Sequence, residues 1–281
     1  DYFEINELIF LIRVNKYFLI TFLWEVGINL LFTVCPKIDD VSTMNSKLTS
    51  LFDYLSIDNM ILIFRLLLSE KKILFIHDNY TYLTNTIDSF ISILYPFKWT
   101  HTFIPIMSDQ MMNVLLTMLP FLNGVHESLM KFVQDVFNDE DFDDKDEVFL
   151  VYIKDDKIEL SSSLKKNVEK KKKFKKYVES NVLPLPFEKE LKKELKSIES
   201  NVKSSKRESS KALYVIEIIE NRMRDAFIDV FVKMFHDYEK YTGILGNDVI
   251  FNKVLFLNTI TKDKIFYIEF LESQLFNYYK Y

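Results

Sequence analysis

Length, composition and charge exclude several classes of protein. The chain has 281 residues, 48% hydrophobic and 27% charged, so it can bury the core of one large or two ordinary globular domains and is neither disordered nor fibrous. The net charge of −5 argues against nucleic acid as the main partner, because phosphate-binding proteins usually carry a basic excess. The single cysteine, Cys35, excludes an internal disulfide and a cysteine-based zinc site and predicts a reducing, cytoplasmic location.

The most hydrophobic long window covers residues 8–24, but it is not a membrane span. Arg13, Asn15 and Lys16 lie at its centre, where each charge would cost about 2.5 to 3.5 kcal/mol on insertion. A signal peptide is excluded because the charges lie inside the apolar run and no small-residue cleavage site follows. We therefore predict an amphipathic helix over residues 8–20 and a strand over 28–34.

The most informative stretch begins with two apolar segments. Residues 60–68 contain one polar residue, Arg65, which predicts a helix buried on nearly every side. Residues 73–76 (ILFI) then form a short apolar run of β-prone residues, as expected of a strand in the middle of a covered sheet. From residue 80 the apolar positions recur every three or four residues, so a second helix packs back over the strand until Pro96 stops it.

The next residues continue this alternation. Residues 102–106 predict a second strand and residues 109–119 a helix, after which residues 120–126, with Asn123 and Gly124, are predicted to turn the chain. Strands that alternate with helices imply parallel strands joined by right-handed crossovers. The predicted fold class is therefore an α/β lobe with a mainly parallel sheet covered by helices.

A helix, an acidic run and a hairpin complete the predicted lobe. Residues 127–137 have a helical apolar period, and seven of the nine residues from 139 to 147 are acidic. This run lacks the alternate acids and the glycine of a calcium-binding loop, so we interpret it as a solvated loop. Residues 148–153 and 157–160 then predict two strands around a tight turn at Asp155 and Asp156.

Three blocks within this lobe resemble a known family. Residues 68–75 (LSEKKILF), 94–106 (LYPFKWTHTFIPI) and 120–126 (PFLNGVH) occur in the order and at the spacing of the central lobe of DENN domains. The resemblance implies a regulator of Rab-type small GTPases, most often a guanine-nucleotide exchange factor. It also implies a module of three parts, namely an upstream lobe, a central α/β lobe and a downstream helical part.

The resemblance predicts how the chain is divided. We expect residues 1–36 to hold the end of the upstream lobe with a linker helix and the first strand, residues 37–160 the central lobe, residues 161–210 a Lys/Ser-rich linker, and residues 211–281 the downstream helical region. Phe22 lies where the central lobe should begin. Because Asp1 is not an initiator methionine, we also expect the sequence to begin inside a longer protein, with most of the upstream lobe before Asp1.

The predicted linker is rich in lysine. Eight of the twelve residues that begin at Lys165 and end at Lys176 are lysines, which predicts a solvated segment. An alternative is weak contact with an anionic membrane surface, at about 1 kcal/mol per lysine. A short charged helix over residues 188–197 and a polar tract over residues 199–211 complete the linker.

Downstream, the sequence predicts only helices. Apolar residues keep a helical period from 213 to 241, and Gly243 is placed to end that helix in a left-handed conformation. A short helix over residues 247–257 and a last helix over residues 266–276 follow. The predicted downstream part is therefore an all-α region.

No catalytic, metal or cofactor motif is present. The chain has no phosphate-binding glycine loop, and its four histidines never have the spacing of a zinc motif, so we assign structural roles to His101 and His126. We expect no cofactor and no covalent chemistry. An exchange factor needs neither, because it acts by binding the nucleotide-free GTPase more tightly than the GDP-bound form.

Candidate GTPase-contact residues follow from the strand order. Ligands of open α/β sheets gather at the carboxyl ends of the strands, which here predicts two groups: Asp78, Asn79 and Tyr80, and Ser108, Asp109 and Gln110. All six also suit ordinary turns and helix N-caps.

Three functions were weighed. The first is a Rab exchange factor that promotes GDP release in vesicle trafficking, peripheral on vesicle membranes, and the alternative is a trafficking scaffold that binds a GTPase without exchange. An activator of GTP hydrolysis would need an arginine finger. The predicted α/β part contains only Arg13 and Arg65, which argues against it.

Overall fold

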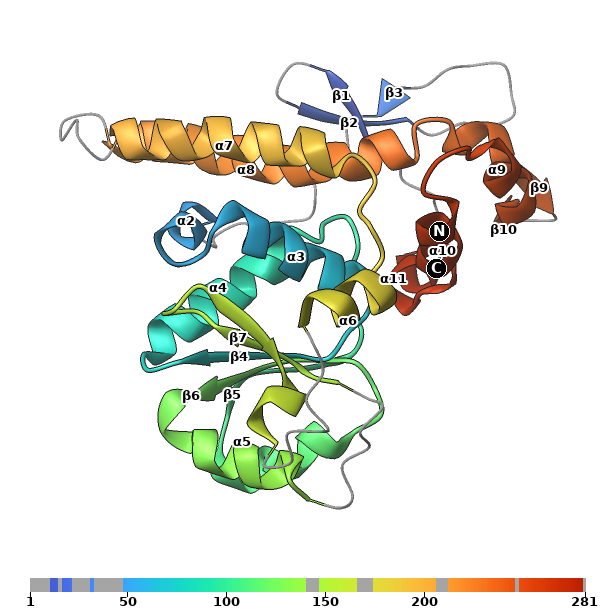
Figure 1. The fold of residues 1–281 in the computed structure, drawn as a ribbon. Helices are drawn as coiled ribbons and strands as arrows, with labels where there is room; N and C mark the ends of the chain where they lie inside the picture. The colour runs from blue at the N-terminus through green and yellow to red at the C-terminus, as the bar shows by residue number, and fades with distance from the viewer. Residues whose placement is uncertain are drawn as a thin grey trace, which may run out of the picture.

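The computed structural model describes eight stretches of the chain, drawn in colour in Figure 1. They are residues 11–14, 17–21, 31–32, 48–139, 147–165, 174–205, 212–245 and 248–279. The start predicted for the central lobe at Phe22, most of the acidic run and the middle of the lysine-rich segment lie outside them. No helix in the described stretches combines the length and the apolarity needed to cross a membrane.

The N-terminal residues form a small antiparallel sheet. Strands β1 (Leu11–Val14), β2 (Tyr17–Thr21) and β3 (Leu31–Phe32) pair in the order β1-β2-β3, so the helix predicted over residues 8–20 is wrong. Most residues of β1 and β2 are β-branched or aromatic, and this preference for strands outweighs the helical spacing. The strand predicted over residues 28–34 is confirmed for the two residues of β3.

A five-stranded sheet forms the centre of the molecule. It contains β4 (Ile73–His77), β5 (Thr102–Met107), β6 (Phe121–His126), β7 (Phe149–Tyr152) and β8 (Lys157–Leu160), in the order β5-β6-β4-β7-β8. All neighbours are parallel except β7 and β8, which form the predicted antiparallel hairpin. The predicted sheet, mainly parallel and covered by helices, is therefore confirmed.

Strand β6 was predicted to be a turn, and that prediction is wrong. The segment contains Asn123 and Gly124, a typical turn pair, yet it pairs with both β4 and β5. A Cβ atom added to Gly124 would lie 2.2 Å from the carbonyl oxygen of Pro105, so glycine permits a close approach of strands here. The Asn123 side chain accepts a hydrogen bond from the Ile104 N–H (3.0 Å) next to the bulge between Ile104 and Met107.

Helices cover both faces of this sheet (Figure 1). On one face lie α3 (Ile57–Leu68), which contains the predicted buried helix, and α4 (Tyr80–Ser92). On the other lie the 3-10 helix η3 (Asp109–Leu116) and α5 (Met130–Phe137). Short helices precede or follow these elements: η2 (Leu48–Ser50), α2 (Leu51–Tyr54), η4 (Glu127–Leu129) and η5 (Ser161–Leu164).

The strand residues alternate between two hydrophobic clusters. Ile73 and Phe75 of β4 belong to the cluster beneath α3 and α4, whereas Leu74 and Ile76 belong to the cluster beneath η3 and α5. All five residues of β4 are buried, so this strand lies in the interior. A fully apolar run was the correct signal for such a strand.

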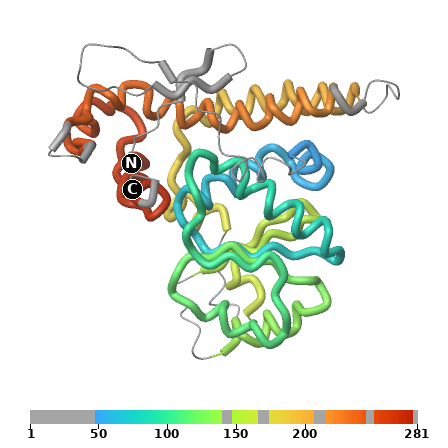
Figure 2. Tube along the Cα trace, turned by 180° about the vertical axis from the view of Figure 1, so that it is seen from behind, coloured from blue at the N-terminus to red at the C-terminus, as the bar shows by residue number. Residues whose placement is uncertain are grey.

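The downstream region is mainly helical. After α6 (Phe174–Asn181), helices α7 (Glu188–Ser205) and α8 (Ala212–Met234) run side by side across the α3 side of the molecule (Figures 1 and 2). Residues 199–205 were predicted to belong to a polar linker, but they continue α7 and bury Val202. Leu191, Leu195 and Ile198 lie on the same buried stripe as Val202, so three- and four-residue spacing holds within a charged sequence.

A β-hairpin interrupts the helices predicted after α8. Helix α8 ends at Met234 and is followed by η7 (Tyr238–Tyr241), β9 (Thr242–Leu245) and β10 (Asp248–Phe251). The predicted helical downstream region is confirmed apart from this hairpin, and the helix end predicted at Gly243 is wrong because α8 ends at Met234. Tyr238 stacks on Phe251 with ring centroids 4.0 Å apart, a contact that the hairpin makes possible.

Three short helices close the chain. They are α9 (Lys253–Thr259), α10 (Lys264–Glu272) and α11 (Gln274–Tyr279). The last helix predicted over residues 266–276 is thus two helices, divided at Ser273. Its hydroxyl donates to the Phe270 carbonyl (2.6 Å) and accepts from the Phe276 N–H (3.2 Å), which ends one helix and starts the next.

Aromatic side chains join the sheet region to the helical region. Phe64 of α3 contacts Phe227 and Phe231 of α8, with ring centroids 4.9 and 5.7 Å apart. Phe97, which precedes β5, contacts Phe231 (4.9 Å) and Phe270 (5.1 Å). One hydrophobic cluster therefore contains residues from both regions, while the domain boundaries at residues 36, 160 and 210 remain predictions.

Candidate functional site

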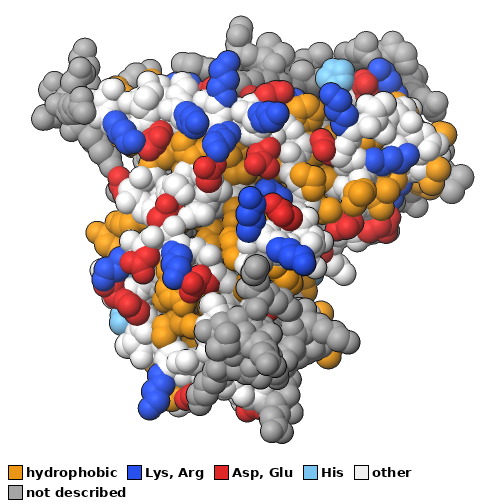
Figure 3. All heavy atoms as spheres, in the orientation of Figure 1, with side chains coloured by type: hydrophobic (Ala, Val, Ile, Leu, Met, Phe, Trp, Pro, Cys, Tyr) orange, Lys and Arg blue, Asp and Glu red, His pale blue; other side chains and the backbone are white. Residues whose placement is uncertain are grey.

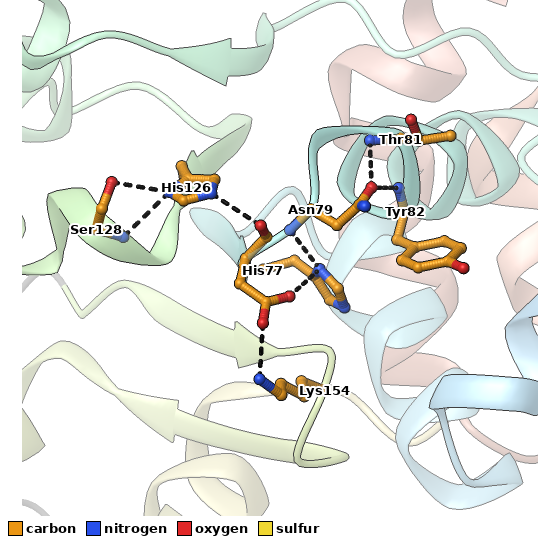
Figure 4. A network of polar contacts seen from close by, with 8 residues as sticks. His77, Asn79, Thr81, Tyr82, His126, Ser128 and Lys154 are labelled. Carbon is orange, nitrogen blue, oxygen red and sulfur yellow. Dashed lines mark hydrogen bonds and ion pairs between the residues drawn. The ribbon is translucent and has the colours of Figure 1, made fainter.

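The carboxyl ends of three neighbouring strands meet at one edge of the sheet. His77 ends β4 and lies opposite His126, which ends β6, and Lys154 follows the end of β7 (Figure 4). Parallel strands bring their ends to the same edge, so residues far apart in sequence become neighbours. The first predicted group, Asp78 to Tyr80, lies in the middle of this edge.

Asp78 connects the three strand ends. Its carboxylate accepts a hydrogen bond from Lys154 Nζ (2.7 Å), and its backbone carbonyl accepts from His126 Nε2 (2.8 Å) (Figure 4). The hydrogen bond and charge of Lys154 lower the pKa of Asp78, and the same contact raises the pKa of Lys154. Both side chains are exposed, so we assign this ion pair an orienting role and not a large stabilising one.

Backbone N–H groups contact both histidine rings. The Asn79 N–H donates to His77 Nδ1 (2.8 Å), which also lies 3.1 Å from the Asp78 carboxylate, and the Ser128 N–H donates to His126 Nδ1 (3.2 Å). In His126 Nδ1 is therefore the acceptor, and the proton of the neutral ring lies on Nε2. The structural role predicted for His126 agrees with these contacts.

Asn79 caps helix α4. Its side-chain oxygen accepts from the N–H groups of Thr81 (2.9 Å) and Tyr82 (3.2 Å). These are the donors that could otherwise bind a phosphate at a helix N-terminus. This end of α4 is thus occupied by the protein's own side chain.

Tyrosines form the exposed part of this edge. Tyr80 is 51% exposed and its ring lies over His126, with centroids 4.7 Å apart. Tyr82 is 42% exposed and packs on Tyr54 of α2, with centroids 5.0 Å apart. Burial, the hydrogen bond with Tyr82 and the charge of Asp53 raise the pKa of Tyr54 to about 12, so its hydroxyl keeps its proton at neutral pH.

The second predicted group lies apart from the first. Ser108, Asp109 and Gln110 are exposed where β5 leads into η3, and strand β6 separates β5 from β4. The Asp109 carboxylate accepts from the Gln110 N–H (2.9 Å), a local turn contact. The structure places both groups at one edge of the sheet but brings only the first into a network.

Sequence reasoning missed His126, Lys154, Tyr54 and Tyr82 as members of this edge, although it placed His77 at the end of the first strand. The signal for His126 was lost when β6 was taken for a turn, because a parallel strand there would have placed its end beside His77. Tyr82 lies three residues after Asn79, which caps α4. Its place in the first turn of that helix could have indicated that it lies at this edge.

Two cavities lie elsewhere in the described structure. Among the described residues, no group of three or more His, Cys, Asp or Glu side chains is placed to hold a metal ion. A cavity of about 260 Å³ lies at the end of α3 against α10, lined by Glu70, Glu269 and Glu272 among others. A second, of about 370 Å³, lies between η7, β10 and α9.

Comparisons with known proteins agree on one family. Residues 22–152 match the model of the DENN (AEX-3) domain. Over 87 residues the chain is 31% identical to DENN domain-containing protein 2A of Homo sapiens, a match that covers 31% of this chain and 9% of that protein. It is 37% identical over 78 residues to DENN domain-containing protein 2B of Mus musculus, covering 28% of this chain and 7% of the relative.

A third relative, DENN domain-containing protein 1A of Homo sapiens, is 31% identical over 96 residues, which cover 34% of this chain and 10% of that protein. The matches thus span about a tenth or less of the relatives' own length. The DENN domain match, residues 22–152, contains α3 and the parallel strands β4 to β7. Over these residues the chain is similar to the DENN domain family, and the structure has the α/β fold expected of that match.

Proposed function

We propose that this protein regulates a Rab-type small GTPase and that it acts as a guanine-nucleotide exchange factor in vesicle trafficking. The observation that carries the proposal is the DENN domain match over residues 22–152, together with a parallel sheet that presents an exposed carboxyl edge. Exchange needs no general acid, metal or cofactor. It needs a surface that binds one state of the GTPase more tightly than another.

The required binding preference is moderate. Accelerating GDP release a thousandfold takes about 4 kcal/mol of preference for the nucleotide-free form. A few well-placed contacts of an ordinary interface can supply that amount. We place part of the contact surface at Asp78, Asn79 and Tyr80 and part at Ser108, Asp109 and Gln110, the two exposed groups at the carboxyl edge.

The test is release of labelled GDP from a panel of Rab proteins. We expect an extended polypeptide that includes an upstream lobe to accelerate release from at least one Rab. The chain of 281 residues alone should bind the same Rab weakly and release GDP little faster than the spontaneous rate, because DENN modules are expected to hold the GTPase across the upstream and central lobes. Full activity of the shorter chain would place the whole contact within it.

A scaffold is the alternative that the same assay separates. Stable binding of a GTP-loaded or nucleotide-free Rab, without faster release from any member of the panel, would establish a scaffold and refute exchange. Binding of the chain to anionic and to neutral vesicles would test the further prediction that the segment from Lys165 to Lys176 contacts membranes. No gain in vesicle binding over neutral vesicles would refute that prediction.

A further inference from the structure

The side chains at the exposed carboxyl edge of the sheet indicate which kind of partner surface can bind there. We propose that Tyr54, Tyr80 and Tyr82, called the tyrosine ledge below, together with the carboxylates around them, contact an arginine- or lysine-bearing segment of the GTPase. This inference rests on the proposed function and names part of the surface that performs it. Of the three tyrosines, Figure 4 shows Tyr82, which lies beside the His77 network.

The ledge is exposed but held in place. Tyr80 packs against His126, and Tyr82 packs against both Tyr54 and His77, the latter with ring centroids 5.5 Å apart. Rings fixed by such contacts lose little side-chain entropy when a partner binds. Tyrosine is also among the residues that most often dominate binding energy, because it offers a large apolar face and a hydroxyl.

The charges around the ledge are mainly negative. Asp53 is close enough to act on the Tyr54 hydroxyl, and Asp78, Glu127 and Asp155 all act on Lys154. Three carboxylates thus act on the one ammonium group. At the left of Figure 3 acidic side chains lie beside basic, hydrophobic and histidine side chains on the surface of the sheet region.

Aromatic faces bordered by carboxylates favour a cationic partner. Arginine and lysine side chains are attracted to tyrosine faces, and carboxylates at the rim speed the approach of a basic surface. An anionic ligand is disfavoured because Asn79 occupies the free N–H groups of α4. A second copy of the chain is also disfavoured, since it would present the same acidic rim.

The exposed apolar residues of β5 fit a partner less well. Phe103 and Ile106 are exposed on this edge strand, but β5 contains no charged residue that could select a partner. The Ile104 N–H points toward β6, so by alternation the nitrogen of Pro105, which carries no hydrogen, points to the open side. The strand therefore lacks a donor where an added strand would need one.

Tyrosine substitutions provide the first test. We expect Tyr80→Ala and Tyr82→Ala each to weaken binding of a nucleotide-free Rab about tenfold, and Tyr80→Phe to restore most of the affinity. Phe132→Ala is the matched control, because Phe132 is an aromatic residue of α5 that is 47% exposed and does not belong to the ledge. Wild-type affinity for the control variant and reduced affinity for the two tyrosine variants would support the ledge.

Charge reversal provides the second test. Asp53→Lys and Glu127→Lys should slow association several-fold, and the difference from the wild type should shrink as salt concentration rises. Thermal unfolding of the two charge-reversal variants should match the wild type, since Asp53 and Glu127 are exposed, and thermal unfolding of the tyrosine variants checks that they remain folded. The inference would be overturned, with the proposed function intact, if the double variant Tyr80→Ala/Tyr82→Ala and the charge-reversal variants bound the Rab as tightly and as fast as the wild type. Failure of the wild type and of the extended polypeptide to bind any Rab would overturn both.

Discussion

The sheet and the α7–α8 helix pair are stabilised in different ways. In the sheet, the strands β4 and β6 are buried along nearly their whole length, and β6 lies so close to β5 and α4 that Gly124 has no room for a side chain. Helix α7 instead buries one narrow stripe and exposes charged side chains, including Glu190 and Glu194, which pair with Lys233 and Arg222 of α8. The stability of the sheet depends on how closely its backbones pack, whereas the stability of the helix pair depends on the apolar area that it buries.

The largest effect is expected at Gly124. Gly124→Val places a branched side chain against the Pro105 carbonyl and against Ile87, where an added Cβ would lie 2.7 Å from the Ile87 side chain. The Pro105 carbonyl cannot move away without separating β5 from β6, so we expect a loss of more than about 4 kcal/mol in the free energy of unfolding. Urea unfolding would measure it.

Gly243→Val is the control, because nothing lies within 4 Å of an added Cβ there. We expect this variant to remain within about 1 kcal/mol of the wild type. Equal losses of unfolding free energy at the two glycines would show that the close approach of β5 and β6 does not limit stability. The sheet would then not differ from the helix pair in this respect.

The helix pair is tested at Ile198. This side chain is fully buried on the α7 stripe, so Ile198→Ala should cost about 2 to 4 kcal/mol through lost apolar contact and a residual cavity. Ile216→Ala, at an exposed position of α8, should change stability by less than about 0.5 kcal/mol. Because one hydrophobic cluster spans both regions, unfolding of the Ile198 variant should remain a single transition, and a separate early transition would contradict this.

A smaller effect is expected at Asn123. Asn123→Ala removes the acceptor of the Ile104 N–H inside the sheet, and leaving a buried donor unpaired costs about 1 to 3 kcal/mol. Hydrogen exchange of the Ile104 amide should accelerate more than that of the other β5 amides. Uniform acceleration along β5 would instead mean that the substitution acts through the whole strand.

The smallest effect is expected at the exposed ion pair. The pKa of Asp78 is lowered in the folded protein, so its contribution is present above the ordinary pKa of 3.8 and is lost as pH falls through the lowered value. The pKa of Lys154 is raised, so its contribution is present below 10.5 and is lost as pH rises through the raised value. Asp78→Asn should therefore lower the thermal midpoint slightly between these limits and not at more acidic pH. A constant difference at all pH values would point to a lost hydrogen bond and not to the charge.

Much of the fold could be predicted from the sequence where periodicity and burial agree. Helix α3 and strand β4 were correct because a helix or strand covered on both sides must be apolar throughout. The hairpin of β7 and β8 was correct because Asp155 and Asp156 mark a tight turn between two apolar runs. In the candidate site, Asp78 and Tyr80 were placed correctly at a strand end, while their partners His126 and Lys154 were not found.

The sequence alone determined the α/β class and its buried centre, because the spacing of hydrophobic residues follows directly from the local geometry of helices and strands. It also carried the resemblance to the DENN family. Only the tertiary structure decided that Asn123 and Gly124 lie in a central strand, that Tyr238 packs on a hairpin and that α7 extends to Ser205. In each of these cases the structure depends on a contact with residues that lie outside the short sequence window from which the element was predicted. The tyrosine ledge has the same origin, since Tyr54 contacts Tyr82 and His77, and Lys154 contacts Asp78, only in the folded chain.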